Sequence, residues 1–252
     1  VVFFLLFVEK VNQGVHAVLV PIRDNSGKTL PGIEIEDCDY KIGLNGVDNG
    51  RIRFTRVRVP RTNLLNKYGN IDENGKYSSP IENESKRFFT MLGTLIGGRV
   101  CVPRAGLSAA KTALTIAIRY ALQRRQFGEE GKEEILIMDY PSHQRRLMPL
   151  LAKAYAFDFA LTFLTKKYTT QSDSEMRESE SMAAVLKSLT TWFTTDAIQE
   201  CREACGGKGY LSEMRFGDLK ADTDIFTTFE GDNTVLLQLV ARSVLHDFKK
   251  EW

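Results

Sequence analysis

An acidic residue in front of a predicted helix is the first feature of the sequence that could do chemistry. Glu230 lies between Phe229 and Gly231 in the segment TFEGDNTVLLQLVAR, residues 228–242. A carboxylate can act as a general base when burial raises its basicity. Acids are also common next to helix N-termini, and Asp232 could itself cap the helix that follows. The segment alone leaves both interpretations of Glu230 open.

A double glycine marks a second place where a ligand could bind. Gly206 and Gly207 follow a predicted helix in the segment ACGGKGY, residues 204–210. Glycine ends helices readily, and its lack of a side chain also lets another molecule approach the backbone closely. The segment is not a G-x-G-x-x-G fingerprint and follows a helix rather than a strand, which argues against a Rossmann nucleotide site. A helix stop and a ligand contact are both consistent with this pattern.

Two groups of polar residues around arginines can likewise be either structural or ligand-binding. Arg124, Arg125 and Gln126 fall at the end of a predicted helix, just before Phe127. Cations near a helix C-terminus are favoured by about 0.3–1 kcal/mol and need no function, but the guanidinium fork also matches phosphate oxygens. Arg99 follows two glycines in an otherwise apolar helical stretch, where it either extends to water or meets an anion.

The first part of the chain is predicted to form strands. Residues 1–8, VVFFLLFV, are typical of a buried strand, and residues 50–60, GRIRFTRVRVP, alternate apolar and basic side chains. Eight apolar residues are too few for a membrane helix, which needs about 20, and they lack the features of a signal peptide. We therefore expect the chain to start inside a β-domain and to contain no membrane span.

The rest of the chain is predicted to be helical after a polar linker. Residues 65–86 are rich in Gly, Pro, Asn and Ser, which predicts a boundary between two regions. Over residues 87–252 apolar positions recur at helical spacing in four long stretches, and Pro103 and Pro149 are expected to kink or break two of them. The predicted fold is mainly α: a partial β-domain over residues 1–64, then the linker, then an antiparallel four-helix bundle.

Composition limits the classes of partner. The 34 basic and 32 acidic residues give a net charge of +2, which favours neither nucleic acid nor a membrane surface. Cys201 and Cys205 could lie one helical turn apart, but a zinc site needs about four ligands and none of the three histidines is adjacent to this pair. We expect reduced, mostly buried thiols, a reducing compartment and no metal site.

Taken in order, several segments resemble acyl-CoA oxidases, the flavoenzyme branch of the acyl-CoA dehydrogenase superfamily. The resemblance covers essentially all 252 residues. The segments that carry it are HAVLVPIRD, GLNGVDNGRIRF, RVPRTNLL, TIAIRYALQRRQFG, LLAKAYAFDFA, ECREACGGKGY and FEGDNTVLLQ. It implies that residues 1–64 are the second part of a middle β-domain and that residues 87–252 are a C-terminal helical bundle of the acyl-CoA dehydrogenase type. The family's flavin-facing β-domain residues would lie before Val1, which leaves these residues short of a complete FAD site.

The resemblance also implies roles for the residues singled out above. Glu230 matches the family's catalytic base, Gly231 would leave room for the substrate chain, and Arg99 matches an arginine that some relatives use near the acyl-CoA. The FAD contacts that it implies are Arg124, Gln126, Phe127, Gly206, Gly207, Asp232 and Thr234. The first three of these belong to a motif that contacts FAD bound mainly to the other subunit. We therefore expect a homodimer with FAD at its interface.

The implied reaction is the FAD-dependent oxidation of acyl-CoA to trans-2-enoyl-CoA, with electrons passed to O2 to give H2O2. Glu230 would take the α-proton while the flavin takes the β-hydrogen as hydride. Two alternatives stay open: an acyl-CoA dehydrogenase that uses an electron-transfer flavoprotein, and a non-catalytic helical domain used for assembly. Such an oxidase is expected in the peroxisome of a eukaryote or in the cytoplasm of a bacterium.

Overall fold

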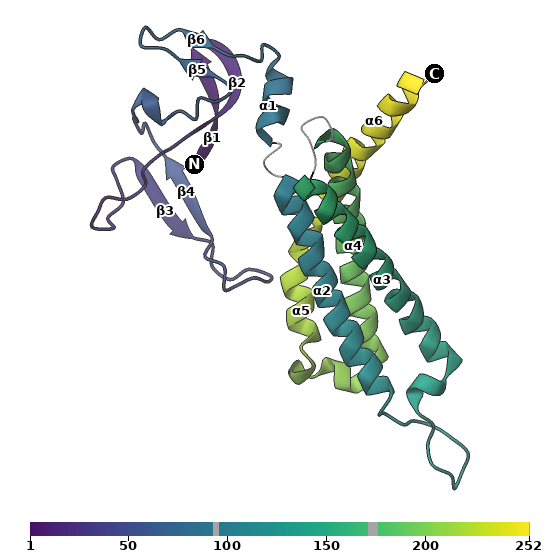
Figure 1. Cartoon of the computed structure of the whole chain (residues 1–252). Helices are drawn as coiled ribbons and strands as arrows, with labels where there is room; N and C mark the ends of the chain where they lie inside the picture. Colours follow the sequence, from purple (N-terminus) through teal and green to yellow (C-terminus); the bar gives the residue numbers. More distant parts are fainter. Residues whose placement is uncertain (93–95, 171–175, 252) are drawn as a thin grey trace. The chain divides into compact units, whose positions relative to one another are not determined.

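The protein is mainly helical with small sheets, as the sequence predicts (Figure 1). The computed structural model describes residues 1–92, 96–170 and 176–251. The chain forms two compact units. Unit 1 comprises Val1–Lys41 and Asn45–Thr94, and unit 2 comprises Ile42–Leu44 and Leu95–Trp252.

The described strands of unit 1 pair into antiparallel sheets of two strands each. The pairs are β1 (Val2–Val8) with β2 (Val11–Val18), β3 (Ile33–Asp37) with β4 (Gly50–Phe54), and β5 (Asn70–Ile71) with β6 (Tyr77–Ser78). The unit also contains the 3-10 turn η1 (Arg61–Asn63) and helix α1 (Glu84–Leu92). Glu9 and Lys10 join β1 to β2 with positive φ angles of 51° and 67°, the sign that a type I′ hairpin turn needs at both positions.

The strands of unit 1 are less buried than the sequence predicts. On β1, Phe3, Leu5 and Phe7 are exposed. On β4, where one face was expected to be buried, Ile52 and Phe54 are 46% and 37% exposed. A sheet of two strands has too little surface of its own to cover both faces. Apolar faces of these strands are therefore open in the described part of the chain.

Residues 65–86, expected as a linker, are folded into unit 1. They include Tyr77 on β6, whose hydroxyl lies 2.9 Å from Nε2 of the buried His16 on β2. Arg87 on α1 is also buried, and its guanidinium donates to the carbonyl oxygen of Ile81 at 2.9 Å and to that of Gln13 on β2. These hydrogen bonds order a segment whose composition alone is typical of a linker.

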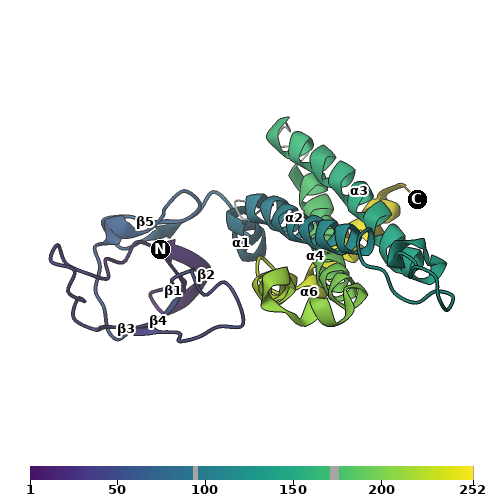
Figure 2. The same ribbon diagram turned by 90° about the horizontal axis from the view of Figure 1, so that it is seen from below.

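Unit 2 is built from long helices and short 3-10 turns. The helices are α2 (Ile96–Ala121), α3 (Pro141–Thr170), α4 (Met176–Ala204), α5 (Phe216–Asp224) and α6 (Asn233–Glu251). The 3-10 turns are η3 (Ile137–Asp139), η5 (Gly206–Tyr210), η6 (Ser212–Met214) and η7 (Ile225–Thr227). Helix α4 contacts each of the other helices and so forms the centre of the unit (Figure 2).

The helix limits agree with the sequence prediction in one respect and differ from it in two. Helix α2 continues through Pro103 and α3 continues through Pro149, so neither proline ends its helix. The last helix, expected from about Asp232 to about Phe248, is α6 (Asn233–Glu251), in agreement with the prediction. Helix α5 and the turns around it are absent from the sequence prediction, because elements this short carry little periodic signal.

A row of small residues brings α2 close to α4. Ala110, Ala113, Ala117 and Ala121 recur at spacings of three and four along α2 and are buried in the core. A side chain at Gly106 on the same helix would place its Cβ 3.0 Å from the Thr194 hydroxyl on α4, which shows how closely the two backbones approach. Side chains of this size let the helices pack at short range.

Helix α3 is long and apolar enough to cross a membrane by length and composition alone. Its buried residues Leu147, Ala154 and Leu161 recur every seven positions and belong to the core of unit 2. A buried stripe of this kind is typical of a core helix in a globular domain. We therefore interpret α3 as a core helix rather than as a membrane span.

Enlarging the alanine row should destabilise unit 2. Ala113→Leu inserts a branched side chain into a filled core, and we expect the free energy of unfolding to fall by about 1–3 kcal/mol. Ala105→Leu makes the same change at an exposed position of α2 and should alter it by less than about 0.5 kcal/mol. Urea unfolding followed by far-UV circular dichroism measures both. Equal effects of the two substitutions would be inconsistent with close packing at the alanine row.

Candidate active site around Glu230

Glu230 lies on a tight turn that joins η7 to α6. Its φ angle is 56° and that of Gly231 is 110°, so two consecutive residues adopt conformations that L side chains rarely take. A Cβ at Gly231 would lie 2.9 Å from the Leu236 side chain. Glycine is therefore required here by backbone conformation and by packing, and the predicted role of Gly231 in making room for substrate stays a prediction.

The Glu230 carboxylate lies directly against α2. A Cβ at Gly98 would be 2.6 Å from Glu230 Cδ and 2.6 Å from Oε2. Only a residue without a side chain leaves space for the carboxylate at this point of the helix. The side chain of Glu230 is half-buried. Gly98, the second of the two glycines before Arg99, thus makes room for the Glu230 carboxylate. The sequence alone did not reveal this contact.

Arg99 contacts the same turn. Its Nε donates to the backbone carbonyl oxygen of Glu230 at 3.1 Å, and its Nη1 lies 3.7 Å from Glu180 Oε1 on α4. The arginine side chain is 13% exposed. The carboxylate of Glu180 therefore balances the charge of Arg99. The hydrogen bond from Arg99 holds the backbone that carries Glu230. The predicted contact of Arg99 with acyl-CoA stays a prediction.

Asp232 provides the cap at the start of α6. The backbone amides of Thr234 and Val235 donate to Asp232 Oδ1 at 2.9 and 3.2 Å. These bonds satisfy amides that have no partner within the helix. The capping interpretation that was open for Glu230 thus belongs to Asp232. The exposed Thr234 contributes its backbone amide to the cap.

Lys187 is the residue that sequence reasoning missed. It is fully buried on α4, and its Nζ donates to the Gly231 carbonyl oxygen at 2.6 Å and to Asn233 Oδ1 at 2.8 Å. Burial lowers the pKa of Lys187 to about 8, although the negative charges of Asp232 and Glu230 oppose the shift. The only signal in the sequence is a lysine in the apolar run MAAVLKSL, at a position that faces the core.

The remaining predicted residues lie at the other end of unit 2. Arg124 Nη2 donates to Gln126 Oε1 at 2.7 Å just after α2, and Phe127 is 71% exposed. Gly206 and Gly207 follow α4, and a Cβ at either position would meet no atom within 4 Å. Both segments therefore present open surface.

The two groups of predicted residues are far apart in one chain. From Gly98 to Ala121, α2 rises about 35 Å, because each helical residue adds about 1.5 Å. The end of α4 lies with the end of α2: Arg146, near the start of α3, pairs with Glu200 near the end of α4, and the Ile137 amide of the segment before α3 donates to the Arg124 carbonyl at 2.9 Å. The structure thus brings Glu230, Gly231, Asp232, Thr234 and Arg99 together. The other predicted residues, which are Arg124, Gln126, Phe127, Gly206 and Gly207, lie at the opposite end of unit 2.

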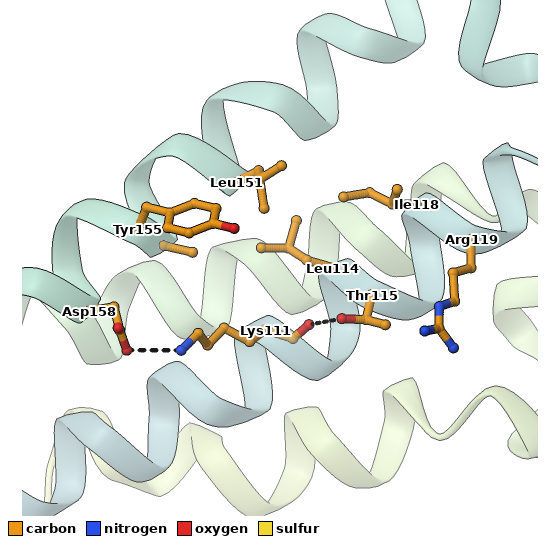
Figure 3. A pocket seen from close by; sticks show the side chains of 9 residues that line it. Lys111, Leu114, Thr115, Ile118, Arg119, Leu151, Tyr155 and Asp158 are labelled. Atoms are coloured by element: carbon orange, nitrogen blue, oxygen red, sulfur yellow. Dashed lines mark hydrogen bonds and ion pairs between the residues drawn. The ribbon is translucent and has the colours of Figure 1, made fainter.

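A groove of about 430 Å³ between α2 and α3 is separate from the Glu230 turn (Figure 3). Leu114, Leu151 and Tyr155 line it, and the ion pair between Lys111 and Asp158, 2.8 Å long, lies at one side. Its residues on α2 begin 13 positions after Gly98, which corresponds to about 20 Å along the helix. The groove therefore does not contain the candidate base.

The described residues contain no group of three or more His, Cys, Asp or Glu side chains that could hold a metal ion. Cys201 and Cys205 are buried free thiols, whereas Cys38 and Cys101 are exposed, so the expectation of mostly buried thiols holds for two of the four cysteines. Burial raises the pKa of Cys201 to about 12 and that of Cys205 to about 11. Thiols with such values are poor nucleophiles and poor metal ligands at neutral pH.

Known proteins that are similar to this chain are acyl-CoA oxidases. The sequence model "Acyl-CoA oxidase, C-alpha1 domain" matches residues 92–245. The chain is 49% identical to the peroxisomal acyl-coenzyme A oxidase 2 of Arabidopsis thaliana, over 96% of this chain and 36% of the relative. An acyl-CoA oxidase 3 structure from Yarrowia lipolytica superposes with a TM-score of 0.86 at 38% identity, covering 97% of this chain and 37% of that one. For a Caenorhabditis elegans acyl-CoA oxidase-1 complexed with FAD and ATP, the TM-score is 0.86 at 32% identity, with 97% and 36% covered.

These matches show that the chain belongs to the acyl-CoA oxidase family. The chain spans about a third of the length of the relatives that it matches. The matched sequence model covers most of unit 2, and therefore includes Gly98, Lys187 and Glu230.

The titration of Lys187 predicts how stability depends on pH. The folded state releases the lysine proton near pH 8, whereas the unfolded chain keeps it to about pH 10.5. Between these values the unfolded chain binds more protons, so this group makes the free energy of unfolding rise with pH, by up to about 1.4 kcal/mol per pH unit. The free energy of unfolding of the wild type, minus that of Lys187→Met, should therefore increase from pH 8 to pH 10 in urea unfolding. A constant difference would mean that burial does not displace the lysine proton.

Proposed function

We propose that this chain carries the proton-abstracting side of an acyl-CoA oxidase active site. Glu230 would remove the α-proton of an acyl-CoA thioester, and FAD, when bound, would accept the β-hydrogen as hydride, so that the product is trans-2-enoyl-CoA. Electrons pass on to O2 and give H2O2, which makes the reaction the first step of fatty-acid β-oxidation. The observation that carries the proposal is the Glu230 carboxylate held against Gly98, in a chain of the acyl-CoA oxidase family.

The Glu230 turn has the properties that a proton acceptor needs. Its backbone is fixed by Arg99 from one helix and by Lys187 from another, which limits the directions that the carboxylate can take. Phe229 next to it stacks on the buried Phe226 with ring centroids 5.0 Å apart, which supplies an apolar wall. A carboxylate that loses water when a substrate binds becomes a stronger base. These features favour proton abstraction over a capping role for Glu230.

The residues at the opposite end of unit 2 fit the diphosphate and adenosine part of FAD. Arg124 presents an exposed guanidinium that can pair with phosphate oxygens, and Gly206 and Gly207 leave their backbone open to close approach. We propose that Gln126 and Phe127 contribute to the same contact and that Asp232 and Thr234 contact FAD near the Glu230 turn. When bound, FAD supplies the acceptor for the hydride and the route for electrons to oxygen.

The separation of the two groups of residues supports a homodimer with FAD at its interface. The rise of about 35 Å along α2 makes it difficult for one extended cofactor to contact both ends of the same chain. In a homodimer, the base of one subunit and the Arg124 segment of the other can serve the same FAD. A dimer would also contain two equivalent sites, as two-fold symmetry requires.

We propose the domain assignment that the family resemblance implies. Residues 1–64 correspond to the second part of a middle β-domain, and the exposed apolar faces of β1 and β4 are consistent with cover by further strands. Residues 87–252 correspond to the C-terminal domain, in which α2, α3, α4 and α6 form an antiparallel four-helix bundle. In a eukaryote the enzyme would act in the peroxisome, the location in the name of its Arabidopsis thaliana relative, and in a bacterium in the cytoplasm.

Removing the carboxylate should abolish proton abstraction. In the full-length, FAD-loaded enzyme, Glu230→Gln should slow flavin reduction by acyl-CoA by about 10²–10⁴-fold, because the amide cannot accept the α-proton. Stopped-flow absorbance of the flavin measures this rate. Glu178→Gln, at an exposed acid of the same unit, should leave it unchanged. A full rate in Glu230→Gln would favour a non-catalytic domain, and turnover without peroxide in the wild type would favour an electron-transfer flavoprotein as acceptor.

Adding a methyl group at Gly98 should displace the base. The new Cβ of Gly98→Ala would lie 2.6 Å from Glu230 Cδ, so that the carboxylate must move, and a displacement of about 1 Å can cost about 10²-fold in rate. Gly97→Ala is the matched control, because its methyl meets only the Tyr168 hydroxyl at 3.3 Å. We expect flavin reduction to slow by at least about tenfold in Gly98→Ala and by less than about twofold in Gly97→Ala. Identical rates in the two variants would place the reacting carboxylate elsewhere.

A further inference from the structure

A fully buried lysine lies beside the base and exchanges no proton or hydride with the substrate in the proposed reaction. Lys187 on α4 has no exposed surface, and lysine is almost never fully buried unless it is paired. The charged groups that act on it come from two elements: Arg99 on α2, and Glu230 and Asp232 on the turn before α6. A lysine in this position requires a reason other than packing, since an apolar residue would fill the same space at lower desolvation cost.

The side-chain hydrogen bonds of Lys187 lead to the Glu230 turn and to the start of α6. Its Nζ donates to the Gly231 carbonyl oxygen at 2.6 Å and to Asn233 Oδ1 at 2.8 Å. The first acceptor directly follows Glu230 in the chain, and the second is the first residue of α6. One ammonium group thus joins the base segment and the helix start to α4, and ammonium is suited to this because it offers several donors in different directions.

Asn233 extends this connection into the core. Its Nδ2 donates to the Ser188 carbonyl oxygen at 3.2 Å and to Thr191 Oγ1 at 2.9 Å, both on α4. All of these groups are buried. A buried polar network in which the members satisfy one another is rigid and geometrically specific. The position of the first residue of α6 is therefore set by α4 through Lys187, Ser188 and Thr191.

The turn itself has little intrinsic tendency to keep its shape. Glu230 has a φ of 56°, a region that costs a residue with a side chain about 1–2 kcal/mol. Its carbonyl accepts from Arg99 on α2, and the next carbonyl, that of Gly231, accepts from Lys187 on α4. Two cations from two helices therefore hold two consecutive carbonyl groups. This arrangement opposes relaxation of the strained peptide unit.

We propose that Lys187 is a positioning residue for the catalytic base, which holds the Gly231–Asp232 peptide directly after it so that the Glu230 carboxylate stays against Gly98. The inference rests on the proposed role of Glu230 for its catalytic meaning, but the mechanical role of Lys187 can be tested without turnover. Lys187 touches neither the reacting carboxylate nor any proposed substrate atom in the described contacts. It acts through the backbone of Glu230 and Gly231.

The first test measures the turn rather than the activity. In the full-length, FAD-loaded enzyme, Lys187→Met keeps an unbranched stem and removes the donors. Hydrogen–deuterium exchange of peptides that cover residues 228–236 should become at least about tenfold faster, while peptides from the middle of α2 and α3 keep their wild-type rates. Leu147→Ala, a cavity in the core next to Arg146 at the opposite end of unit 2, is the control for general destabilisation and should not accelerate residues 228–236 selectively.

The second test follows the base. In Lys187→Met the limiting rate of flavin reduction should fall about 10- to 100-fold, while the dissociation constant of acyl-CoA stays within about twofold. The double variant with Glu230→Gln should be no slower than Glu230→Gln alone, because Lys187 acts only through Glu230. Lys187→Gln retains one amide donor group. Its exchange rate at residues 228–236 and its rate of flavin reduction should lie between those of the wild type and Lys187→Met. This variant allows the same test if the methionine variant does not fold.

The outcomes separate this inference from the proposed function. Unchanged exchange of residues 228–236 in both Lys187 variants, or acceleration shared equally by α2 and α3, would overturn the positioning role and leave Lys187 as a core residue. Losses in the double variant that simply multiply would also overturn it, because they mean that Lys187 acts independently of Glu230. A full rate in Glu230→Gln would instead refute the base assignment, while the exchange result would still decide how the turn is held.

Discussion

The close packing of α2 against α4 is the constraint on which the candidate site depends. The alanine row and Gly106 allow the two helices to approach, so that residues from both can reach the same turn. From α2 come the space at Gly98 and the guanidinium of Arg99, and from α4 comes the ammonium of Lys187. If larger side chains separated the helices, the two cations could not hold adjacent carbonyl groups. The geometry of the candidate site therefore depends on the packing of α2 against α4 in the core of unit 2.

The turn before α6 shows how a reactive group can be fixed by its backbone. The cap bonds go to Asp232, the buried amide of Asn233 attaches the helix start to α4, and the Glu230 carboxylate remains directed at α2. Each neighbouring residue thus has a structural contact of its own. A catalytic constellation needs such support, because small displacements of a reacting group reduce rates strongly.

Much of the architecture follows from sequence pattern, and part of it does not. The long helices carry strong helical periodicity, and α6 was expected because a polar triplet precedes an apolar run. The short α5 was not expected, because an element of this length carries little periodic signal. The hairpin turn at Glu9 and Lys10 was not expected either, since neither glutamate nor lysine favours positive φ. The burial of β1 and β4 was overestimated, because alternation predicts a covered face but does not supply the layer that covers it.

Part of the candidate site could also be predicted from local sequence, whereas the rest depends on contacts between distant residues. The segment around Glu230 could be identified through its resemblance to acyl-CoA oxidases, and the family membership is confirmed. The roles of Gly98 and Lys187 could not be found in this way, because they depend on contacts between residues far apart in the sequence. In the sequence, Gly98 is one of two helical glycines and Lys187 is a charge in an amphipathic helix.

The central claim is that Glu230 is the base that removes the α-proton. A crystal structure of the full-length, FAD-loaded enzyme with an unreactive acyl-CoA thioether tests it most directly. The account predicts a Glu230 carboxylate oxygen about 3–3.5 Å from the substrate carbon that corresponds to the α-carbon, with Gly98 adjacent. A substrate carbon next to a different acid, with Glu230 directed away from it, would contradict the account.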